Sequence, residues 1–212
     1  MDRCKGRQGA KLTMYEVDDL DRVVELDNLP QSSVGAPLPC VLADEHRVIL
    51  AYYMEEALPG WDGSTVRIVG PSMADEPIAI VRFRSCRAHM FGPPNDEAFA
   101  GHPLATRGLR PYAVFRIDRS SWIRKLERMN SVHPGHRPDN FWKRQHLVFA
   151  FHDSTFECVC EGFEITQARG SMQDAFPQMV SFWNGSASDT GCFSYLSLPT
   201  FSIGQYPNTA LP

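Results

Sequence analysis

Long apolar runs are missing from this 212-residue chain, and none approaches the roughly 20 residues that a membrane-spanning helix needs. The N-terminal stretch also lacks the apolar core that follows the basic residues of a secretory signal. The six cysteines are scattered, and only Cys158 and Cys160 lie close together. This is neither a dense disulfide framework nor a pair of zinc knuckles. We therefore expect a soluble protein of a reducing, cytoplasmic compartment, with mostly buried free thiols.

An excess of positive charge is also absent. The net charge is −4 and the pI is near 6.0. The one basic interval, residues 116–128, also carries Asp118 and Glu127, which is typical of a solvated helix face. These features exclude the usual electrostatic surface for nucleic acid, and we expect neither nucleic acid nor a membrane as partner.

Short segments rich in β-branched and aromatic residues predict most of the secondary structure. A near-continuous apolar run at 78–83 indicates a central strand that is buried on both faces. Further strands are expected in a hairpin at 40–54 and at 65–69, 112–117, 146–151 and 156–165. Residues 14–27 fit either a short amphipathic helix or an edge strand.

One helix is expected over residues 120–131. Ser120 is a good N-cap, and Ile123, Leu126 and Met129 follow at helical spacing. We therefore predict an α+β fold over residues 14–167, with a mostly antiparallel, curved sheet that carries this helix on one face. A small half-open barrel is the favoured variant, because many short strands with Pro- and Gly-rich turns tend to close.

Two flanking regions are expected outside this domain. Residues 1–13 are polar and without periodicity, which predicts a flexible N-terminus. Residues 168–212 have few charges but many Ser, Pro and aromatic residues. We expect this C-terminal extension to pack along the domain, to form a homo-oligomer interface, or to be a poorly ordered, lineage-specific extension.

Polar residues interrupt the apolar pattern in two segments, 84–104 and 152–157. In the first, Pro93 and Pro94 must end a strand, and Asn95 is expected to cap a brief helical turn that begins at Asp96. The second segment, HDSTFE, lies inside an apolar stretch. We expect the two segments to meet in space at the mouth of the half-open barrel and to form the functional site.

These segments contain the residue types that zinc, iron or manganese sites use: His89, His102 and His152, with Glu97 and Asp153 as carboxylates. The three histidines are the candidate ligands for a divalent transition metal. No pair has HxH or HxxxH spacing and no HExxH occurs, so spacing alone does not single out a metal site. Without a metal, the same five residues are candidate catalytic acids and bases.

The cysteine and the arginines of the first segment have alternative explanations. Cys86 and His89 fall on opposite faces of a regular strand, so a buried thiol explains Cys86 better than a nucleophile does. Arg84 and Arg87 are candidate cofactor-binding residues, since a guanidinium fork matches a carboxylate or phosphate. Salt bridges to Asp153 or Glu157 would explain both arginines without a ligand.

From Val81 to Glu164 the sequence resembles a family of short, uncharacterised and mainly bacterial proteins. The resemblance rests on FRSCRAHMFGPPNDEAFAGHPL, SSWIRKLERMN and FAFHDSTFECV. It implies that these segments belong to one unit, and it brings no activity with it.

Two classes of function follow from the sequence. The first is a small-molecule-binding protein or small enzyme with a His/carboxylate site at the rim of a β-rich domain, with or without a metal. The alternative is a non-catalytic binding or structural module that acts through a sheet edge or the aromatic C-terminal tail. Clustering of histidines and acids in one concave pocket would favour the first class.

Overall fold

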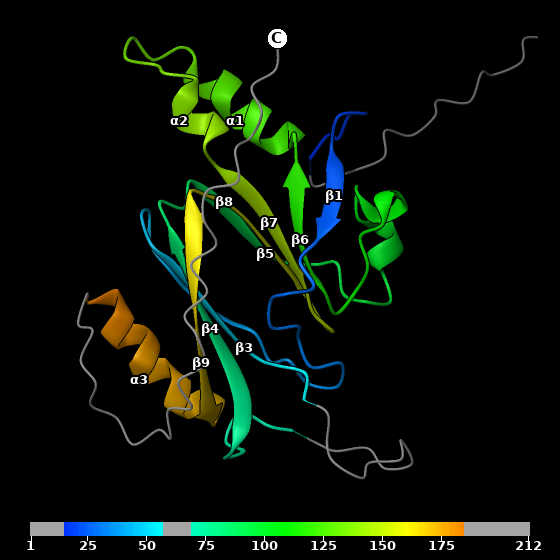
Figure 1. Ribbon diagram of the computed structural model, residues 1–212, viewed down its shortest axis with the longest axis vertical. Helices are drawn as coiled ribbons and strands as arrows, with labels where there is room; N and C mark the ends of the chain where they lie inside the picture. The colour runs from blue at the N-terminus through cyan, green and yellow to red at the C-terminus, as the bar shows by residue number, and fades with distance from the viewer. Residues whose placement is uncertain (1–14, 57–68, 185–212) are drawn as a thin grey trace, which may run out of the picture.

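The computed structural model describes residues 15–56 and 69–184. It has an α+β fold with antiparallel strands, as predicted, and these strands form two sheets (Figure 1). The five-stranded sheet has the order β1 (Arg22–Glu25), β6 (Val114–Asp118), β7 (Gln145–Ala150), β8 (Thr155–Cys160) and β5 (Ala88–Gly92). The four-stranded sheet has the order β2 (Cys40–Ala43), β3 (Val48–Tyr53), β4 (Glu76–Arg84) and β9 (Gly162–Gly170).

The two sheets are joined at a corner, which we call the β4–β9 corner. There β4 turns into β5 and β8 turns into β9, and each pair of strands remains hydrogen-bonded on both sides of the turn. The Glu161 N–H donates to the Arg84 carbonyl at 2.9 Å, and the Arg87 N–H donates to the Val159 carbonyl at 2.7 Å. The ladder therefore continues through the corner, and the result is a strongly bent sheet that does not close. This confirms the expected curved sheet.

The core between the two sheets is aromatic. Phe83, Phe149 and Phe156 contact one another with ring centroids 5.3–6.1 Å apart, and Tyr52 packs on Phe149. Cys158 and Cys160 also face this core, as expected for alternate positions of one strand. Each such buried side chain contributes about 1.5–3 kcal/mol of hydrophobic stabilisation.

The outer face of the five-stranded sheet is covered by short helices. They are α1 (Ser121–Asn130), α2 (Asp139–Trp142) and the single 3₁₀ turns η1 (Phe99–Gly101) and η2 (Ala105–Arg107). The Ser120 hydroxyl accepts a hydrogen bond from the Ile123 N–H at 3.3 Å, which confirms the predicted N-cap. The Ala98 N–H donates to the Asn95 side chain at 3.1 Å, as predicted for Asn95, but the helical turn begins later than predicted, at Phe99, and its N-cap residue Ala98 provides no side-chain cap.

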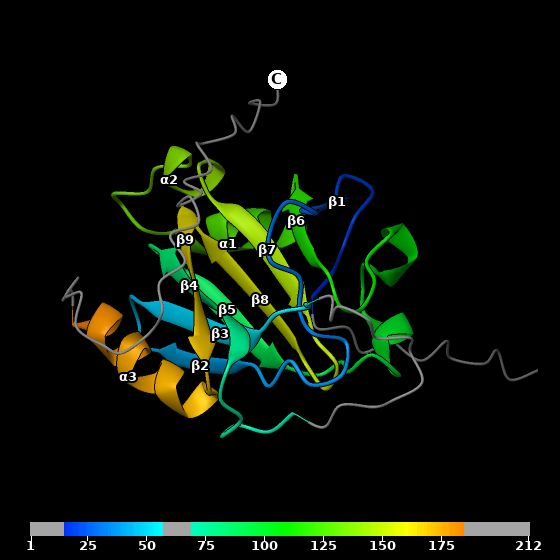
Figure 2. The same cartoon turned by 60° about the horizontal axis from the view of Figure 1, so that its bottom comes forward.

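A further helix, α3 (Met172–Trp183), covers the outer face of the four-stranded sheet (Figures 1 and 2). Sequence reasoning missed it. Its start carries a capping box in which Ser171 and Asp174 each bind the other's backbone N–H. The predicted domain boundary at residue 167 falls inside β9, and the described chain continues through α3.

Two predicted features of the N-terminal third are present in the structure. Part of the segment 14–27 forms an edge strand, β1, and this resolves the alternative of helix or strand. The hairpin predicted at 40–54 is present as β2 and β3. The predicted flexible N-terminus, the strand at 65–69 and most of the C-terminal extension lie outside the described residues. In the part of the chain that is described, no helix is long and apolar enough to cross a membrane.

Candidate functional site

The two polar segments meet in space, as predicted, and one meeting point is buried. Glu157 on β8 faces the outer side of the five-stranded sheet, where its carboxylate binds two histidines. His102 Nε2 lies 2.9 Å from one carboxylate oxygen, and His146 Nε2 lies 2.8 Å from the other. The hydroxyl of Tyr15 donates to the second oxygen at 2.9 Å. We call these four residues the Glu157 cluster.

The hydrogen bonds of the cluster define the protons on its histidines. His102 Nδ1 accepts from the Leu104 N–H at 3.1 Å, so the ring proton must lie on Nε2 and point to Glu157. His146 Nδ1 lies 2.8 Å from the Ser120 hydroxyl, whose oxygen already accepts from the α1 backbone. His146 donates to Glu157 from Nε2. Two imidazoles and a phenol thus donate hydrogen bonds to one carboxylate.

Burial alone would raise the pKa of the Glu157 carboxyl. The hydrogen bonds from His102 and His146 overcome this effect and lower the pKa to about 2. Burial and the neighbouring Glu157 charge raise the pKa of Tyr15 well above its ordinary value, so Tyr15 keeps its proton. Glu157 is therefore an ionised carboxylate that accepts hydrogen bonds from His102, His146 and Tyr15.

The Glu157 cluster is closed to solvent. The side chains of Glu157, His102 and His146 have no exposed surface. Trp122 of α1 packs over the cluster, stacked on Tyr15 at 5.7 Å and edge-on to His146 at 5.1 Å. A substrate has no access to these groups, so the cluster acts as a structural link between β8, β7, α1 and the η1–η2 segment.

The second meeting point lies at the turn between β7 and β8. His152 Nδ1 is 3.0 Å from the Asp96 carboxylate and 2.7 Å from the Tyr112 hydroxyl, which also binds Asp96. The Asp96 N–H donates to the His152 carbonyl at 2.8 Å. The His152 side chain is 41% exposed, so this group, unlike the Glu157 cluster, is open to solvent.

Asp153 lies beside the second meeting point, with its carboxylate 3.9 Å from His152 Nε2, and Glu97 directly follows Asp96. The other residues predicted for the site lie apart from both meeting points. His89 is exposed on β5, stacked over Phe156, and Arg84 and Arg87 are exposed, as are Glu97 and Asp153. The Arg84 guanidinium lies over the corner glycine Gly162, where a Cβ would be 2.7 Å from Nη2. The expected explanation of the arginines by a salt bridge to Glu157 is wrong, because His102, His146 and Tyr15 bind that carboxylate.

Metal binding receives no support from this arrangement. Across residues 15–56 and 69–184, no group of three or more His, Cys, Asp or Glu side chains could hold a metal ion. His89, His102 and His152 therefore do not form the predicted ligand set. His102 is also unsuited on its own account, since its two ring nitrogens are bound to Glu157 and to the Leu104 N–H.

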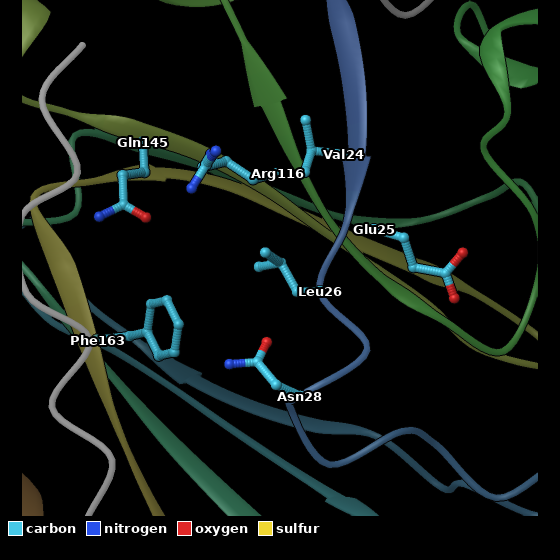
Figure 3. Close-up of a pocket in the computed structure, with 7 residues that line it drawn as sticks. All are labelled: Val24, Glu25, Leu26, Asn28, Arg116, Gln145 and Phe163. Atoms are coloured by element: carbon cyan, nitrogen blue, oxygen red, sulfur yellow. The ribbon is translucent and has the colours of Figure 1, made fainter.

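A cavity of about 310 Å³ opens between the sheets (Figure 3). It lies on the side where the bent sheet does not close, and none of the predicted site residues lines it. Its lining comes from the β1 region, β6, β7 and β9: Val24, Glu25, Leu26, Asn28, Arg116, Gln145 and Phe163. We call this cavity the inter-sheet pocket. The prediction that the two polar segments form the mouth of the half-open barrel is wrong, because both lie on the outer face or at the strand turn.

Sequence reasoning missed His146, Tyr15 and Tyr112, as well as the pocket. A signal for His146 was present in the hairpin register. His146 pairs with Val159, and Glu157 pairs with Val148, so His146 and Glu157 are diagonal neighbours on one face. Alternation around Phe156 and Cys158 already placed Glu157 on the opposite face from those apolar residues. No comparable local signal existed for Tyr15 or Tyr112.

The fold and these features define an α+β protein with two unclosed antiparallel sheets, a buried His/Glu cluster and an inter-sheet pocket. No family model, no curated protein and no solved structure matches the chain. The resemblance to an uncharacterised bacterial family accordingly stays an expectation from the sequence.

Proposed function

We propose that this protein binds a small, uncharged and mostly apolar molecule in the inter-sheet pocket. The observation that carries this proposal is the composition of the cavity, which combines three apolar side chains with two amides and two charged groups that are paired within the protein. A volume of about 310 Å³ is at the lower end for small-molecule sites, and such sites are typically apolar with few polar groups.

The pocket has an apolar side and a polar side. Phe163 belongs to the aromatic core between the sheets, and Leu26 packs against the same core. Gln145 and Arg116 lie at the opposite rim, and Figure 3 shows the Arg116 guanidinium pointing toward Gln145. A ligand would place its apolar body against Phe163 and Leu26 and a polar group near Gln145.

The charges around the pocket are already compensated. Arg116 donates to Asp118 at 2.6 Å, and Glu25 is paired with Arg110. The Glu25 carboxylate also points away from the other lining side chains (Figure 3). A charged ligand would have to compete with these pairs, and this favours an uncharged one.

Hydrogen-bonding capacity comes from two amides. Among the described residues, the side chains of Asn28 and Gln145 have no hydrogen-bond partner, although both line the pocket. An amide offers both a donor and an acceptor, so it suits a carbonyl or a hydroxyl group. The expected ligand therefore carries at least one such group.

The test uses 6-propionyl-2-(dimethylamino)naphthalene, an uncharged dye with one carbonyl group and an emission that shifts to the blue in apolar surroundings. Titration of the full chain should give a saturable blue shift with one site. Leu26→Phe, which fills the cavity, should weaken binding about tenfold or more. Leu20→Phe is the matched control, because Leu20 lies on the exposed surface outside the pocket.

Equal affinity of the Leu26→Phe and Leu20→Phe variants would overturn the proposal. Gln145→Leu, which keeps the size of the side chain but removes its hydrogen bonds, should reduce affinity a few-fold, in line with about 1 kcal/mol for one neutral hydrogen bond. Absence of saturable binding to the unmodified chain would instead favour the alternative class, a module that acts through a sheet edge.

A further inference from the structure

We propose that His152 is a separate reactive centre, with Asp96 and Tyr112 as its positioning residues, and that it transfers acyl groups from small uncharged esters to water. This centre is independent of the inter-sheet pocket. The seven residue steps from Gln145 to His152 correspond to roughly 20 Å of extended chain, so the two features do not share a ligand.

The imidazole of His152 is oriented by groups from distant parts of the sequence. The Asp96 carboxylate lies 3.0 Å from Nδ1, and the Asp96 backbone N–H binds the His152 carbonyl at 2.8 Å. The Tyr112 ring lies nearly parallel to the imidazole, with an interplanar angle of 18° and centroids 6.1 Å apart. A carboxylate at Nδ1 is the arrangement that orients a reactive histidine in acyl-transfer sites.

The protons within this group leave Nε2 free to react. Burial, and then the hydrogen bond to Asp96, raise the pKa of Tyr112 to about 12, so its phenol stays protonated and donates to Asp96. The hydrogen bond from Tyr112, opposed by some burial, lowers the pKa of Asp96, which stays a carboxylate. The Tyr112 hydroxyl and the Nδ1–H of His152 then both donate to the Asp96 carboxylate, so the ring proton of His152 lies on Nδ1. In the neutral ring the lone pair is on Nε2.

Backbone strain marks the same group. Tyr112 has φ of 60°, in the left-handed region that aromatic residues rarely adopt. Such a conformation costs on the order of 1 kcal/mol or more and persists only where the surrounding structure enforces it. Here it places the phenol against Asp96 and His152.

The surroundings indicate which substrates can approach. His152 is 41% exposed, so a small molecule can reach Nε2. The Asp153 carboxylate is 3.9 Å from Nε2, and the Asp96 carboxylate lies on the other side of the ring. Two negative charges repel an anionic substrate, and this favours an uncharged ester.

The reaction proceeds in two balanced steps. Nε2 adds to the acyl carbon, the bond from that carbon to the leaving oxygen breaks, and the products are an acyl-imidazolium, which keeps its proton on Nδ1, and an alkoxide or phenoxide. Water then adds to the acyl carbon and the carbon–nitrogen bond breaks. The products are a carboxylate and the regenerated imidazole, and the protons of the water pass to solvent.

The test follows p-nitrophenolate release from p-nitrophenyl acetate by the full chain. His152→Gln should lower the second-order rate constant about tenfold or more. His46→Gln is the matched control, since His46 is an exposed histidine in the turn between β2 and β3, and it should stay within about twofold of the unmodified protein. A rate for His152→Gln within twofold of the unmodified protein would overturn the proposal.

The positioning roles are tested by Tyr112→Phe and Asp96→Asn, with the rate measured across pH. Both should lower the rate and change the midpoint of its pH profile, which a purely structural contact would leave in place. Mass spectrometry of the unmodified protein after brief acetylation covers the case of a variant that fails to fold. His152 should be acetylated faster than the exposed His46 and His89, and equal or slower labelling would also overturn the proposal.

Discussion

Replacement of Glu157 by Gln tests the central claim about the buried cluster. Glutamine has nearly the size of glutamate and resembles its protonated form, since both lack the negative charge. The carboxyl has an ordinary pKa of 4.5 and a pKa of about 2 in the fold. At about 1.4 kcal/mol for each tenfold change, this difference corresponds to about 3 kcal/mol that the ionised form contributes to folding.

The same figure follows from the contacts. Three donors, from Tyr15, His102 and His146, point at the carboxylate inside a solvent-free site. Removal of one partner of a buried charged group typically destabilises a protein by about 3–5 kcal/mol, because the remaining groups are left without acceptors. We therefore expect Glu157→Gln to lose about 3 kcal/mol of unfolding free energy at pH 7, which is roughly 6–12 °C in melting temperature.

The pH dependence gives a sharper version of the prediction. A folded-state pKa that lies below the unfolded value provides stability that is complete above about pH 5 and is lost as pH falls toward 2. The difference in unfolding free energy between the unmodified protein and Glu157→Gln should thus shrink steadily from pH 5 to pH 2.5. Urea titrations monitored by circular dichroism at several pH values measure it.

Glu164→Gln is the matched control for this experiment. Glu164 also sits on a strand and is ion-paired, with Arg82, but its side chain is 40% exposed. An exposed pair contributes less than about 1 kcal/mol, so this variant should be close to the unmodified protein at every pH. A loss below about 1 kcal/mol for Glu157→Gln, or a difference that does not change between pH 5 and pH 2.5, would refute the account of the cluster.

Three further predictions concern the caps and the core. Ser120→Ala removes both the N-cap of α1 and a hydrogen bond to buried His146, and should cost about 2 kcal/mol in urea unfolding, whereas Ser120→Thr, which keeps the hydroxyl, should recover at least half. Ser171→Ala removes the Ser171 half of the α3 capping box and should cost about 1 kcal/mol, and no change in thermal unfolding would contradict the role of Ser171 as the N-cap. Phe149→Ala in the aromatic core should cost about 3–5 kcal/mol by urea titration, and a loss under about 1 kcal/mol would show that the core between the sheets is not packed as described.

The elements that sequence reasoning predicted well are those with a local signal. The apolar run at 78–83 and the N-cap at Ser120 depend on neighbours within a few positions, and β4 and α1 follow them closely. Helix α3 had the same kind of signal in Ser171 and Asp174. It was missed because the surrounding Ser, Pro and aromatic residues were interpreted as an extension.

The site was harder because its contacts are not local. Glu157 and His102 both appeared among the polar residues of the two segments, and their contact confirms that the segments meet. Their partner Tyr15 comes from the other end of the chain, 142 residues away from Glu157. The contact of Tyr15 with Glu157 depends on how the sheet is assembled, and no spacing in the sequence predicts this contact.

The inter-sheet pocket was even harder to predict from the sequence, because it too depends on residues that are far apart in the chain. Its lining residues are ordinary members of strands and loops, and none interrupts an apolar pattern as His152 does. The cavity arises because two sheets diverge where the bent sheet does not close. Divergence of this kind is a property of the packed whole and not of any segment.

The β4–β9 corner carries a consequence for how the chain tolerates change in length. Strand β4 continues into β5 and strand β8 continues into β9, so each of these pairs contributes to both sheets. An extra residue in β8 would turn the inward-facing side chains outward and would also shift the register of β9 against β4. The charged Glu157 side chain would then face the aromatic core between the sheets, and Phe156 would face the two histidines of the Glu157 cluster. Substitutions at this corner can be absorbed one side chain at a time, whereas a single inserted or deleted residue would disturb both halves of the molecule together.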